Sequence, residues 1–454
     1  MSFDRQSHAP EWQKAFDAVE SLVGGRIVGG GRQARWRPVF FLEVERPDGE
    51  ILPICFRGGR SEVADDGPIR REYECFKALE GNGILVPEIH GFCESPPGIV
   101  MQTSPGRHDL ATAESPEEFE SVRDDFIRIL ADIHRLPTRD FEGFGLEKST
   151  DARILALGDS LSSIKRFRKG KSRPEPALEF LIDWTERNIP RDRSECCFVT
   201  GDSGQFIFEK GRVTAMLDME LAYLGDPLAD LGGLFCRDLS ETMGDLAVAI
   251  GRYEAAIGHA VDRRTVLYHA IRFSMTTPLG TALAVAQPPL SAEYVQYLTW
   301  YLVYTRCPLE LIAHLEGIEI PEPDLPEETL SPYAVPHDAL QARFLAFETH
   351  DEFQAYEADG LRRLALYLRQ GDCFGRDLLE RDLDEVESLL GRRPTSWQDR
   401  DAALEECVRD SAGTRNADLV RYFVRRFKRE EALLAPAMRD LIGVRMQTLP
   451  IGAG

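Results

Sequence analysis

The sequence predicts an α+β protein, in which a small antiparallel sheet near the N-terminus precedes a long and mainly helical region. Apolar segments of strand length lie at residues 37–44 and 51–56, and a Pro-Asp-Gly turn separates them. A second pair of short apolar segments flanks a Gly-containing turn at residues 209–212, as in a β-hairpin. Residues 240–315, in contrast, have helical and apolar patterns.

Composition and charge narrow the class of protein. With 454 residues, 43% of them hydrophobic, the chain is long enough for two or three domains with their own cores. Its formal net charge of −22 argues against non-specific binding to nucleic acid or anionic membranes, which requires basic surfaces. Nine cysteines follow no disulfide or zinc spacing. Because we find no signal sequence and no run of about 18 apolar residues, we expect a cytoplasmic protein with reduced thiols.

The N-terminal segment combines a helix with a glycine-rich stretch. Residues 11–22 have the spacing of a short amphipathic helix, and the sequence GGRIVGGG follows at residues 24–31. Glycine permits close approach of the backbone to a ligand, so Gly29, Gly30 and Gly31 are candidates for a loop that lies over phosphate groups. A glycine cluster that contacts no ligand is the alternative, because such clusters are weak evidence alone.

A buried carboxylate is predicted in the helix that begins at Pro68 and ends at Gly81. Glu72 lies on its apolar stripe, and a carboxylate on a buried face requires a cation. Arg57 lies at the end of the strand formed by residues 51–56. In the alternative reading, Glu72 lies at the edge of the stripe and Arg57 is solvated. The stripe comprises Ile69, Tyr73, Phe76 and Leu79, and Arg70, Arg71 and Lys77 are expected to face away from it.

Two aspartates follow short apolar strands in the middle of the chain. Asp202 follows residues 196–199, and Asp218 follows residues 213–217, the second strand of the expected hairpin. Carboxylates at the ends of adjacent buried strands rarely lack a partner or a metal. Two such ligands suit a hard cation such as Mg²⁺, and one of them can remain free to accept a proton.

These residues carry a resemblance to a known family. The segment from Asp202 through the hairpin, with the sequences DME at residues 218–220, LGDP at 224–227 and DL at 230–231, resembles the aminoglycoside phosphotransferase family. More closely, it resembles the branch that includes the kinase domains of acyl-CoA dehydrogenase family 10 and 11 proteins. The resemblance implies a bilobal, protein-kinase-like fold that uses ATP, or GTP, with Mg²⁺. It also implies that Asp202 orients or deprotonates the acceptor hydroxyl and that Asp218 binds Mg²⁺ on the nucleotide phosphates.

The catalytic loop departs from the family pattern at two positions. Thr200 stands where the family has a histidine, and the loop of residues 203–205 is shorter and lacks the family's asparagine. Gln205 is the amide that remains as a second metal ligand, although its longer side chain shifts the oxygen and Mg²⁺ tolerates poor geometry badly. The alternative function is therefore a catalytically impaired, pseudokinase-like protein that binds a nucleotide or ligand or acts as a scaffold.

The resemblance also assigns roles outside these loops. Arg57, held by Glu72, would reach the nucleotide phosphates. Met101 begins the sequence MQTSPG, which is similar to the family's link between lobes, where the backbone pairs with adenine. The resemblance assigns Asp226 and Asp230 to holding the catalytic loop and starting the next helix.

A helix and a basic run are expected between the predicted site segments. A helix opened by a capping box at residues 115–118 ends near His134, to which we assign packing or capping rather than catalysis. The basic run KRFRKGKSR at residues 165–173 either attracts an anionic substrate or forms a solvated loop.

Four segments are expected along the chain. They are an N-terminal lobe (1–103), a helical C-terminal lobe with the catalytic and metal loops (104–317), a Pro- and Glu-rich linker (318–336) and a helical accessory domain (337–454).

The leading function is ATP- and Mg²⁺-dependent phosphorylation of a hydroxyl group on a small molecule. The branch suggests a hydroxyacyl-CoA or a hydroxy acid as acceptor and the wider family an aminoglycoside, since a fold does not determine a substrate. We expect no nucleic-acid or membrane partner. The helices of residues 337–454 are a candidate surface for homo-oligomerisation, and a third reading makes the protein an assembly scaffold that works through them.

Overall fold

The computed structural model describes the chain apart from residues 1–4, 6–7, 34–36, 60–66, 159, 291, 326–327, 329–330, 350–351 and 452–454. The chain forms two compact units. The first comprises Met1–Asp151, Ser194–Asp230 and Glu241–Ala260, and the second comprises Ala152–Arg193, Leu231–Ser240 and Val261–Gly454. All residues predicted above to bind nucleotide or metal belong to the first unit.

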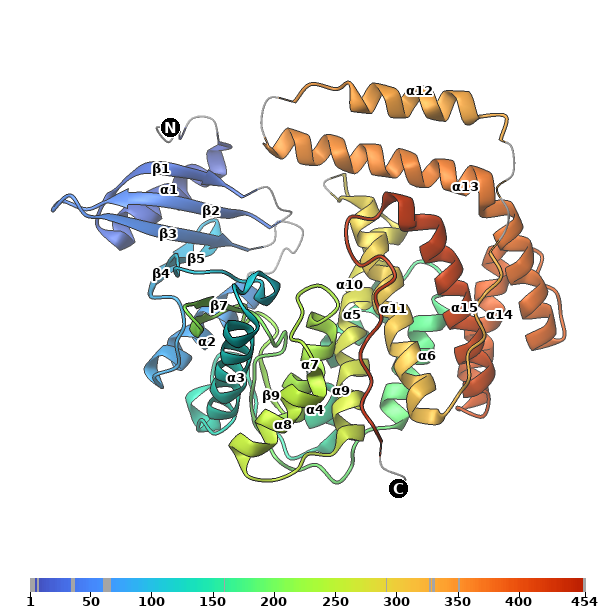
Figure 1. The fold of residues 1–454 in the computed structure, drawn as a ribbon, viewed down its shortest axis with the longest axis horizontal. Helices are drawn as coiled ribbons and strands as arrows, with labels where there is room; N and C mark the ends of the chain where they lie inside the picture. Colours follow the sequence, from blue (N-terminus) through green and yellow to red (C-terminus); the bar gives the residue numbers. More distant parts are fainter. Residues whose placement is uncertain are drawn as a thin grey trace. The chain divides into compact units, whose positions relative to one another are not determined.

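A five-stranded antiparallel sheet forms the N-terminal part of the first unit, as predicted (Figure 1). Helix α1 (Pro10–Val23) packs against it, and Phe16 joins Phe40 and Phe56 in a core without solvent. Helix α2 (Gly67–Gly81) packs against the last two strands, where Tyr73 contacts Phe92. The strand order is β1-β2-β3-β5-β4, with β1 (Arg26–Arg32), β2 (Val39–Glu45), β3 (Ile51–Gly58), β4 (Ile89–Glu94) and β5 (Pro97–Gln102).

The glycine cluster lies within strand β1. Gly29, Gly30 and Gly31 pair in register with residues 41–43 of β2, next to a β-bulge. Gly30 has a φ of +113°, and a Cβ atom there would lie 2.1 Å from the carbonyl oxygen of Phe41. The prediction of a loop at these residues is wrong, because they are part of a strand. The close approach of β2 is sufficient to explain why glycine is required at position 30. Contact with a phosphate stays a prediction, and residues 34–36, which separate Gln33 from Arg37, lie outside the described residues.

Gly30→Ala is expected to destabilise the protein by roughly 2 kcal/mol or more, because an L side chain is strained at this φ and its Cβ has no room. Gly31→Ala is the matched control, since the φ of Gly31 lies outside the left-handed region and no atom lies within 4 Å of a Cβ there. The control should stay within about 1 kcal/mol of the wild type. Urea unfolding measures the difference, and equal losses at both positions would refute the explanation from strand pairing.

Two small sheets carry the loops that contain the candidate site. Strands β7 (Phe206–Glu209) and β8 (Arg212–Met216) form the predicted hairpin, and β6 (Cys197–Val199) pairs with β9 (Tyr223–Gly225). The expectation that Asp202 and Asp218 follow adjacent strands is therefore wrong, because β6 and β8 belong to different sheets. The pairing of β6 with β9 depends on residues distant in sequence, which the local pattern did not reveal.

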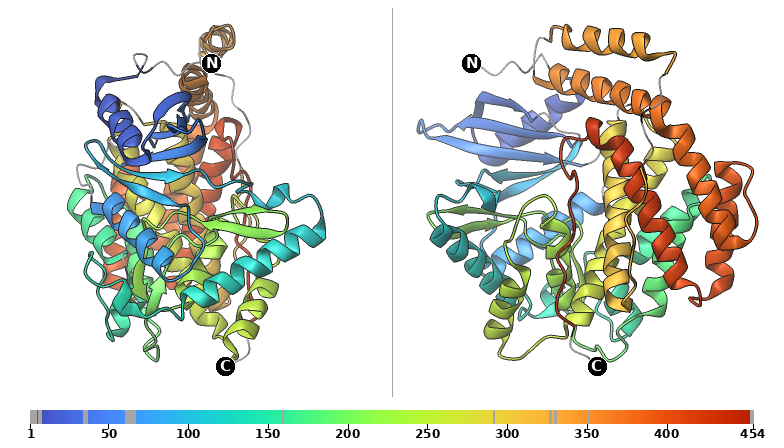
Figure 2. Two further views of the ribbon diagram at one scale, coloured as in Figure 1. Left: turned by 90° about the vertical axis from the view of Figure 1, so that its left-hand side faces the viewer. Right: turned by 45° about the vertical axis from the view of Figure 1, so that its right-hand side comes forward.

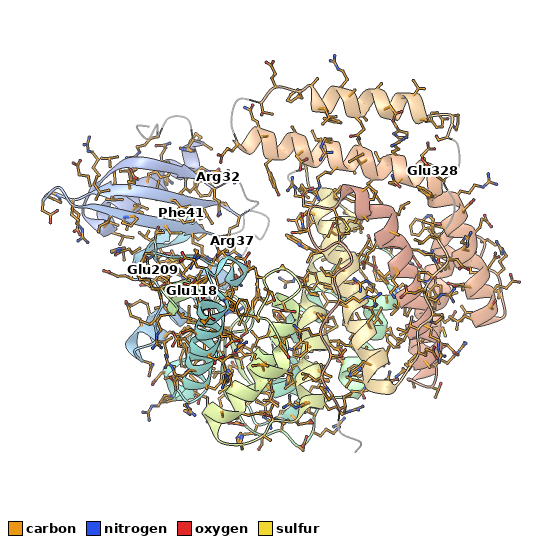
Figure 3. The ribbon with its side chains drawn as sticks, in the orientation of Figure 1. Arg32, Arg37, Phe41, Glu118, Glu209 and Glu328 are labelled. Carbon is orange, nitrogen blue, oxygen red and sulfur yellow. The ribbon has the colours of Figure 1, made fainter. Side chains whose placement is uncertain are left out.

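Helix α3 (Pro116–Ile133) supports the hairpin. The Ser115 side chain accepts the N–H of Glu118, which confirms the predicted N-cap. Glu118 Oε1 accepts the N–H of Gly211 in the hairpin turn (3.3 Å), and a carboxylate oxygen of Asp125 accepts the N–H of Val213 (3.0 Å). Figure 3 labels Glu118 on this helix. These bonds fix the strand that leads to the metal-binding candidate.

The second unit is built from helices. Helix α11 (Tyr294–Glu316) packs against α9 (Arg263–Ser274), α10 (Thr276–Ala286) and α15 (Asn416–Leu434), while α14 (Trp397–Ser411) packs against α6 (Pro176–Arg187). The helices beyond residue 337 thus share a compact unit with earlier ones, and the four-segment division stays a prediction. Other helices are α4 (Ala152–Leu157), α5 (Ser160–Gly170), α12 (Ala334–Leu345) and α13 (Glu352–Leu390), while α7 (Leu228–Arg237) begins in the first unit and α8 (Leu246–Ile257) belongs to it.

Helices α12 and α13 lie side by side in the second unit (Figure 2). Gln341 of α12 donates to the carbonyl of Arg362 in α13 at 3.3 Å. None of the helices in the described part of the chain is long and apolar enough to cross a membrane. None of the nine cysteines, all of which lie in the described part of the chain, forms a disulfide.

Candidate functional site

The loop that carries Asp202 is held by a buried aspartate. The carboxylate of Asp230 accepts hydrogen bonds from the N–H groups of Thr200 (2.9 Å) and Gly201 (3.0 Å) and from the Thr200 hydroxyl (2.8 Å). Asp230 is completely buried, so its carboxylate fixes the backbone immediately before Asp202. These bonds confirm the holding role that the resemblance implied for Asp230, and the threonine at position 200 contributes to it.

His134 extends the same network. Its Nε2 lies 3.0 Å from Oδ2 of Asp230, and its Nδ1 lies 2.7 Å from the hydroxyl of Tyr253. The ring is buried at the C-terminal end of α3, which confirms the predicted packing and capping role. The Asp226 carboxylate accepts the N–H of Leu228 (3.0 Å) and so starts α7, as the resemblance implied.

The catalytic loop (residues 200–205) touches the metal loop (residues 218–221). Gly201 has a φ of +86°, and a Cβ atom there would lie 2.3 Å from the carbonyl oxygen of Leu221, so only glycine permits this approach. The N–H of Leu217 also donates to the carbonyl of Gln205 at 3.0 Å. The shortened loop therefore still brings position 205 next to the residue that precedes Asp218.

Asp202 and Gln205 are hydrogen-bonded to each other. Nε2 of Gln205 donates to Oδ2 of Asp202 at 2.7 Å, and both side chains are half-buried. With its nitrogen committed to Asp202, the amide has its oxygen as the atom able to bind a hard cation. The structure thus brings together the predicted base and the predicted second metal ligand.

Asp218 has an unusual backbone conformation and a close cationic partner. Its φ is +57°, which non-glycine residues adopt rarely and which occurs often at functional sites. Its Oδ1 lies 2.9 Å from Nη2 of Arg57. Nε of Arg57 also donates to Oε2 of Glu72 at 3.0 Å, and Glu72 is fully buried. The predicted pair of Arg57 and Glu72 is therefore present, and it extends to the predicted metal ligand.

Burial and charge determine the protonation of this cluster. Burial raises the pKa of Glu72 to about 7, against the lowering effect of Arg57, and the carboxylates of Asp218 and Glu220 add to the rise. Burial alone would lower the pKa of Arg57, but the carboxylates of Asp218, Glu72 and Glu220 raise it above its ordinary value. Arg57 is therefore a permanent cation, whereas Glu72 changes its charge near neutral pH.

Unfolding measured against pH should reveal the titration of Glu72. Its pKa is about 7 in the folded protein against an ordinary value of 4.5, so the folded state binds the proton more tightly. The resulting stabilisation is complete below about pH 4.5 and is lost as the pH rises through 7, by about 3 kcal/mol. The wild type should therefore lose stability relative to Glu72→Gln over this range. Glu80→Gln, at a solvent-accessible position of α2, is the control, and a constant difference for Glu72→Gln would disprove the titration.

Three further residues of the cluster were not assigned a role from the sequence. Arg37, which Figure 3 labels, forms an ion pair with the carboxylate of Glu220, and its Nη1 lies 3.9 Å from Oε2 of Glu72. Nη2 of Arg71 donates to the carbonyl of Glu220 at 2.7 Å. The sequence predicted only that Arg71 faces away from the apolar stripe of α2, and it did not reveal this contact with a segment distant in sequence. Its neighbour Arg70 stacks on a strand residue and pairs at the surface.

Met101 lies within the sheet. Its backbone pairs in register with Cys55 of β3 and Ile89 of β4, and its side chain is buried. After it, the N–H of Thr103 donates to the carbonyl of Pro53 at 2.8 Å. Pairing of adenine with the backbone of this segment, and a nucleotide contact of Met101, stay predictions.

The oxygen donors fit Mg²⁺ in the company of phosphate. Among the residues that the structure describes, no three His, Cys, Asp or Glu side chains form a metal-binding cluster. Asp218 supplies a carboxylate and Gln205 an amide oxygen, and Mg²⁺ at nucleotide sites is bound by one or two such groups together with phosphates and water. The chain's own residues therefore fit a Mg²⁺–nucleotide complex better than a free ion.

The basic run of residues 165–173 lies in the second unit and is partly paired. It forms the end of α5 and the turn after it, so the expected solvated loop is wrong for residues 165–170. Three of its cations have carboxylate partners, which gives them a structural role and weakens the case for substrate attraction. The pairs are Arg168–Glu179, Lys171–Glu179, Lys171–Glu405 and Arg173–Glu175.

Comparison with known sequences agrees with this geometry. A model described as the phosphotransferase enzyme family matches residues 39–267, half of the chain. Acyl-CoA dehydrogenase family member 10 of Mus musculus is 28% identical over 201 residues, and family member 11 of Rattus norvegicus is 28% identical over 223 residues. The matches cover 41% and 45% of this chain but 17% and 27% of those relatives, so the chain corresponds to a minor part of each.

Solved structures with a similar fold include two proteins named as aminoglycoside phosphotransferases. The protein from Ralstonia eutropha has a TM-score of 0.52 at 19% identity, and the match covers 68% of this chain and 98% of its own. A thermostable mutant of aminoglycoside phosphotransferase APH(4)-Ia has a TM-score of 0.50 at 14% identity, with coverages of 67% and 99%. These matches confirm the predicted α+β, kinase-like fold with a sheet-containing N-terminal lobe and a largely helical remainder.

Proposed function

The chain belongs to the phosphotransferase enzyme family, whose model spans half of it, and on this premise we propose that it transfers a phosphoryl group from ATP, or GTP, to a hydroxyl group of a small molecule. The observation that carries the proposal is the bridge that Arg57 makes between buried Glu72 and Asp218. This bridge sets a permanent cation beside the carboxylate proposed for the metal. Phosphoryl transfer requires both charges at the nucleotide phosphates.

Asp202 is the proposed base. It would orient or deprotonate the acceptor hydroxyl, and its bond from Gln205 fixes the direction of its carboxylate. The hydrogen bonds that Asp230 accepts from Thr200 and Gly201 keep this loop in place. Because most catalysis of phosphoryl transfer is positioning and electrostatics, such pre-ordering supports the enzymatic reading.

Asp218 and the amide oxygen of Gln205 would hold Mg²⁺, which, when bound, neutralises negative charge on the phosphates. Arg57 would bind the phosphates directly, and Glu72 would keep its guanidinium in place. Gly29, Gly30, Gly31 and Met101 complete the proposed nucleotide contacts. Of the glycines, Gly31 has open space around it.

The acceptor is proposed from the relatives' names. Acyl-CoA dehydrogenase family proteins among the relatives favour a hydroxyacyl-CoA or a hydroxy acid, and aminoglycoside phosphotransferases among the similar folds make aminoglycosides the second class to test. The net charge of −22 supports a small-molecule partner over nucleic acid or membrane. A cytoplasmic location, supported by nine free cysteines, and homo-oligomerisation through the C-terminal helices belong to the proposal.

A second candidate, a nucleotide-binding protein without turnover, is favoured by one observation. Gln205 donates to Asp202 and so occupies an oxygen that a substrate hydroxyl would approach. If this bond persists with substrates bound, the base is blocked and the protein binds without reacting. Turnover separates this candidate from the enzyme, and Mg²⁺-dependent thermal stabilisation by ATP separates both from a scaffold.

The test is nucleotide consumption by the purified protein with a panel of hydroxyacyl-CoAs, hydroxy acids and aminoglycosides. Asp202→Asn is expected to abolish turnover with the accepted substrate. Asp183→Asn is the control, since Asp183 pairs with Arg187 at the surface of the second unit, and it should retain full activity. If no acceptor is phosphorylated and ATP with Mg²⁺ does not shift the melting temperature, the enzymatic proposal fails.

A further inference from the structure

Three arginines from three separate segments of the chain converge on the metal loop. Arg57 lies in β3, Arg71 lies in α2, and Arg37 lies two residues before β2. Arg57 contacts the Asp218 carboxylate (2.9 Å), Arg71 donates to the Glu220 carbonyl (2.7 Å), and Arg37 forms an ion pair with the Glu220 carboxylate. The sheet and α2 thus contact the loop on either side of its buried residue 219.

The metal loop needs this support because its backbone is strained. The φ of +57° at Asp218 persists only where the surroundings determine the conformation. Arg37 is 6% exposed and the Glu220 side chain 14%, so their ion pair lies largely out of solvent. Removal of one partner from such a pair leaves a charge buried without compensation, unlike the loss of an exposed pair.

Arg57 has a different position in this arrangement. Its guanidinium already pairs with the carboxylates of Glu72 and Asp218, and under the proposed function it must also bind a phosphate. A phosphate that takes Nη2 of Arg57 removes one contact from Asp218. Arg37 and Arg71 bind Glu220 instead, so this exchange does not require their contacts to break.

We propose that Arg37 and Arg71 are positioning residues that hold the metal loop through Glu220 while Arg57 exchanges Asp218 for a nucleotide phosphate. The inference rests on the proposed function for the exchange and on the contacts of Glu220 for the hold. Neither positioning arginine touches the reacting atoms. Both act on the affinity for Mg²⁺ indirectly, because they hold Glu220, two residues after the aspartate that would bind it.

Arg37→Met and Arg71→Met test the proposal against two matched controls. Arg26→Met removes an exposed arginine that pairs with Glu45 across β1 and β2, and Arg70→Met removes the neighbour of Arg71 on α2, which pairs at the surface. The first readout is the Mg²⁺ concentration for half-maximal phosphotransfer at saturating nucleotide. It should rise about tenfold to a hundredfold in the test variants and less than about twofold in the controls.

A second readout requires no turnover. The melting temperature is measured with a non-hydrolysable ATP analogue as Mg²⁺ is increased, and the Mg²⁺ concentration for the half-maximal shift should rise by the same factor in the test variants. A lower melting temperature with unchanged Mg²⁺ dependence would overturn the proposal, because Arg37 would then only stabilise the fold. A wild-type protein that shows the shift but phosphorylates no acceptor would overturn the proposed function alone. A wild type without any shift would overturn both.

Two conservative variants keep the test decisive if Arg37→Met does not fold. Glu220→Gln removes the charge of the same pair with little change of shape and should raise the half-maximal Mg²⁺ concentration in the same way. Arg37→Lys keeps the positive charge but lacks the forked donor geometry, so an intermediate effect is expected. Wild-type Mg²⁺ dependence in Glu220→Gln would overturn the proposal as well.

Discussion

Asp218→Asn is expected to lower phosphotransfer by about 10²–10³-fold or more while the protein stays folded. Asparagine has nearly the same shape as aspartate and adopts a φ of +57° readily, so the backbone is not disturbed. The variant loses the negative charge that lies 2.9 Å from Nη2 of Arg57 and that we assign to Mg²⁺. The loss should be the same for every acceptor, because it concerns the phosphates and not the acceptor.

Two companion variants separate the charge from the backbone conformation. Asp218→Ala removes the same charge but places alanine at positive φ, so it should lose about 1 kcal/mol of stability in addition to activity. Lys210→Asn changes another residue with positive φ, +51°, in the exposed turn of the hairpin, and should leave turnover unchanged. Turnover and urea unfolding are measured for each protein. Activity of Asp218→Asn within about threefold of the wild type would exclude Asp218 as the metal ligand.

Local patterns were sufficient to predict that Glu72 needs a cation, and the family resemblance identified Arg57 as that cation. Helical spacing put Glu72 on the apolar stripe of α2, where a carboxylate requires a positive partner. The structure contains this pair at 3.0 Å. The hairpin before Asp218 and the Ser115 cap were predictable for the same reason, since each depends on residues close in sequence.

Contacts between distant segments could not be predicted in this way. Arg37 and Glu220 are 183 residues apart, and nothing in the sequence around Arg37 distinguishes it from a solvated arginine before a strand. The spacing of Asp218 and Glu220 around buried Met219 was the available signal. It indicated a second functional acidic residue without indicating its partner. The contact of Arg71 with Glu220 was missed for the same reason, because helical periodicity does not include the metal loop.

The glycine-rich stretch illustrates a different limit. Close approach to a ligand and close approach to a neighbouring strand both require glycine, so the sequence alone could not separate them. In the structure, the carbonyl of Phe41 accounts for Gly30, while Gly31 has no such neighbour. A contact with phosphate is therefore best tested at Gly31.

Asp230→Ala is expected to cost about 3–5 kcal/mol of stability, because it removes the shared acceptor of a buried network. The carboxylate is completely buried and accepts hydrogen bonds from the N–H groups of Thr200 and Gly201 and from the Thr200 hydroxyl. It also lies 3.0 Å from Nε2 of His134. Alanine leaves these donors without an acceptor, and each unsatisfied buried donor carries a desolvation cost. Since Asp202 directly follows Gly201 in the chain, the rate of phosphotransfer should fall as well as the stability.

A graded series would assign the cost to individual groups of this network. Thr200→Val removes one hydroxyl and should cost about 1 kcal/mol. Asp245→Ala is the control, since Asp245 caps α8 by accepting the N–H of Ala247 at an exposed position, and its loss should also cost about 1 kcal/mol. Urea unfolding with unchanged m values measures all three variants. If Asp230→Ala lost no more stability than Asp245→Ala, the carboxylate would not anchor the catalytic loop, and the contact of Gly201 with the metal loop would have to position Asp202 instead.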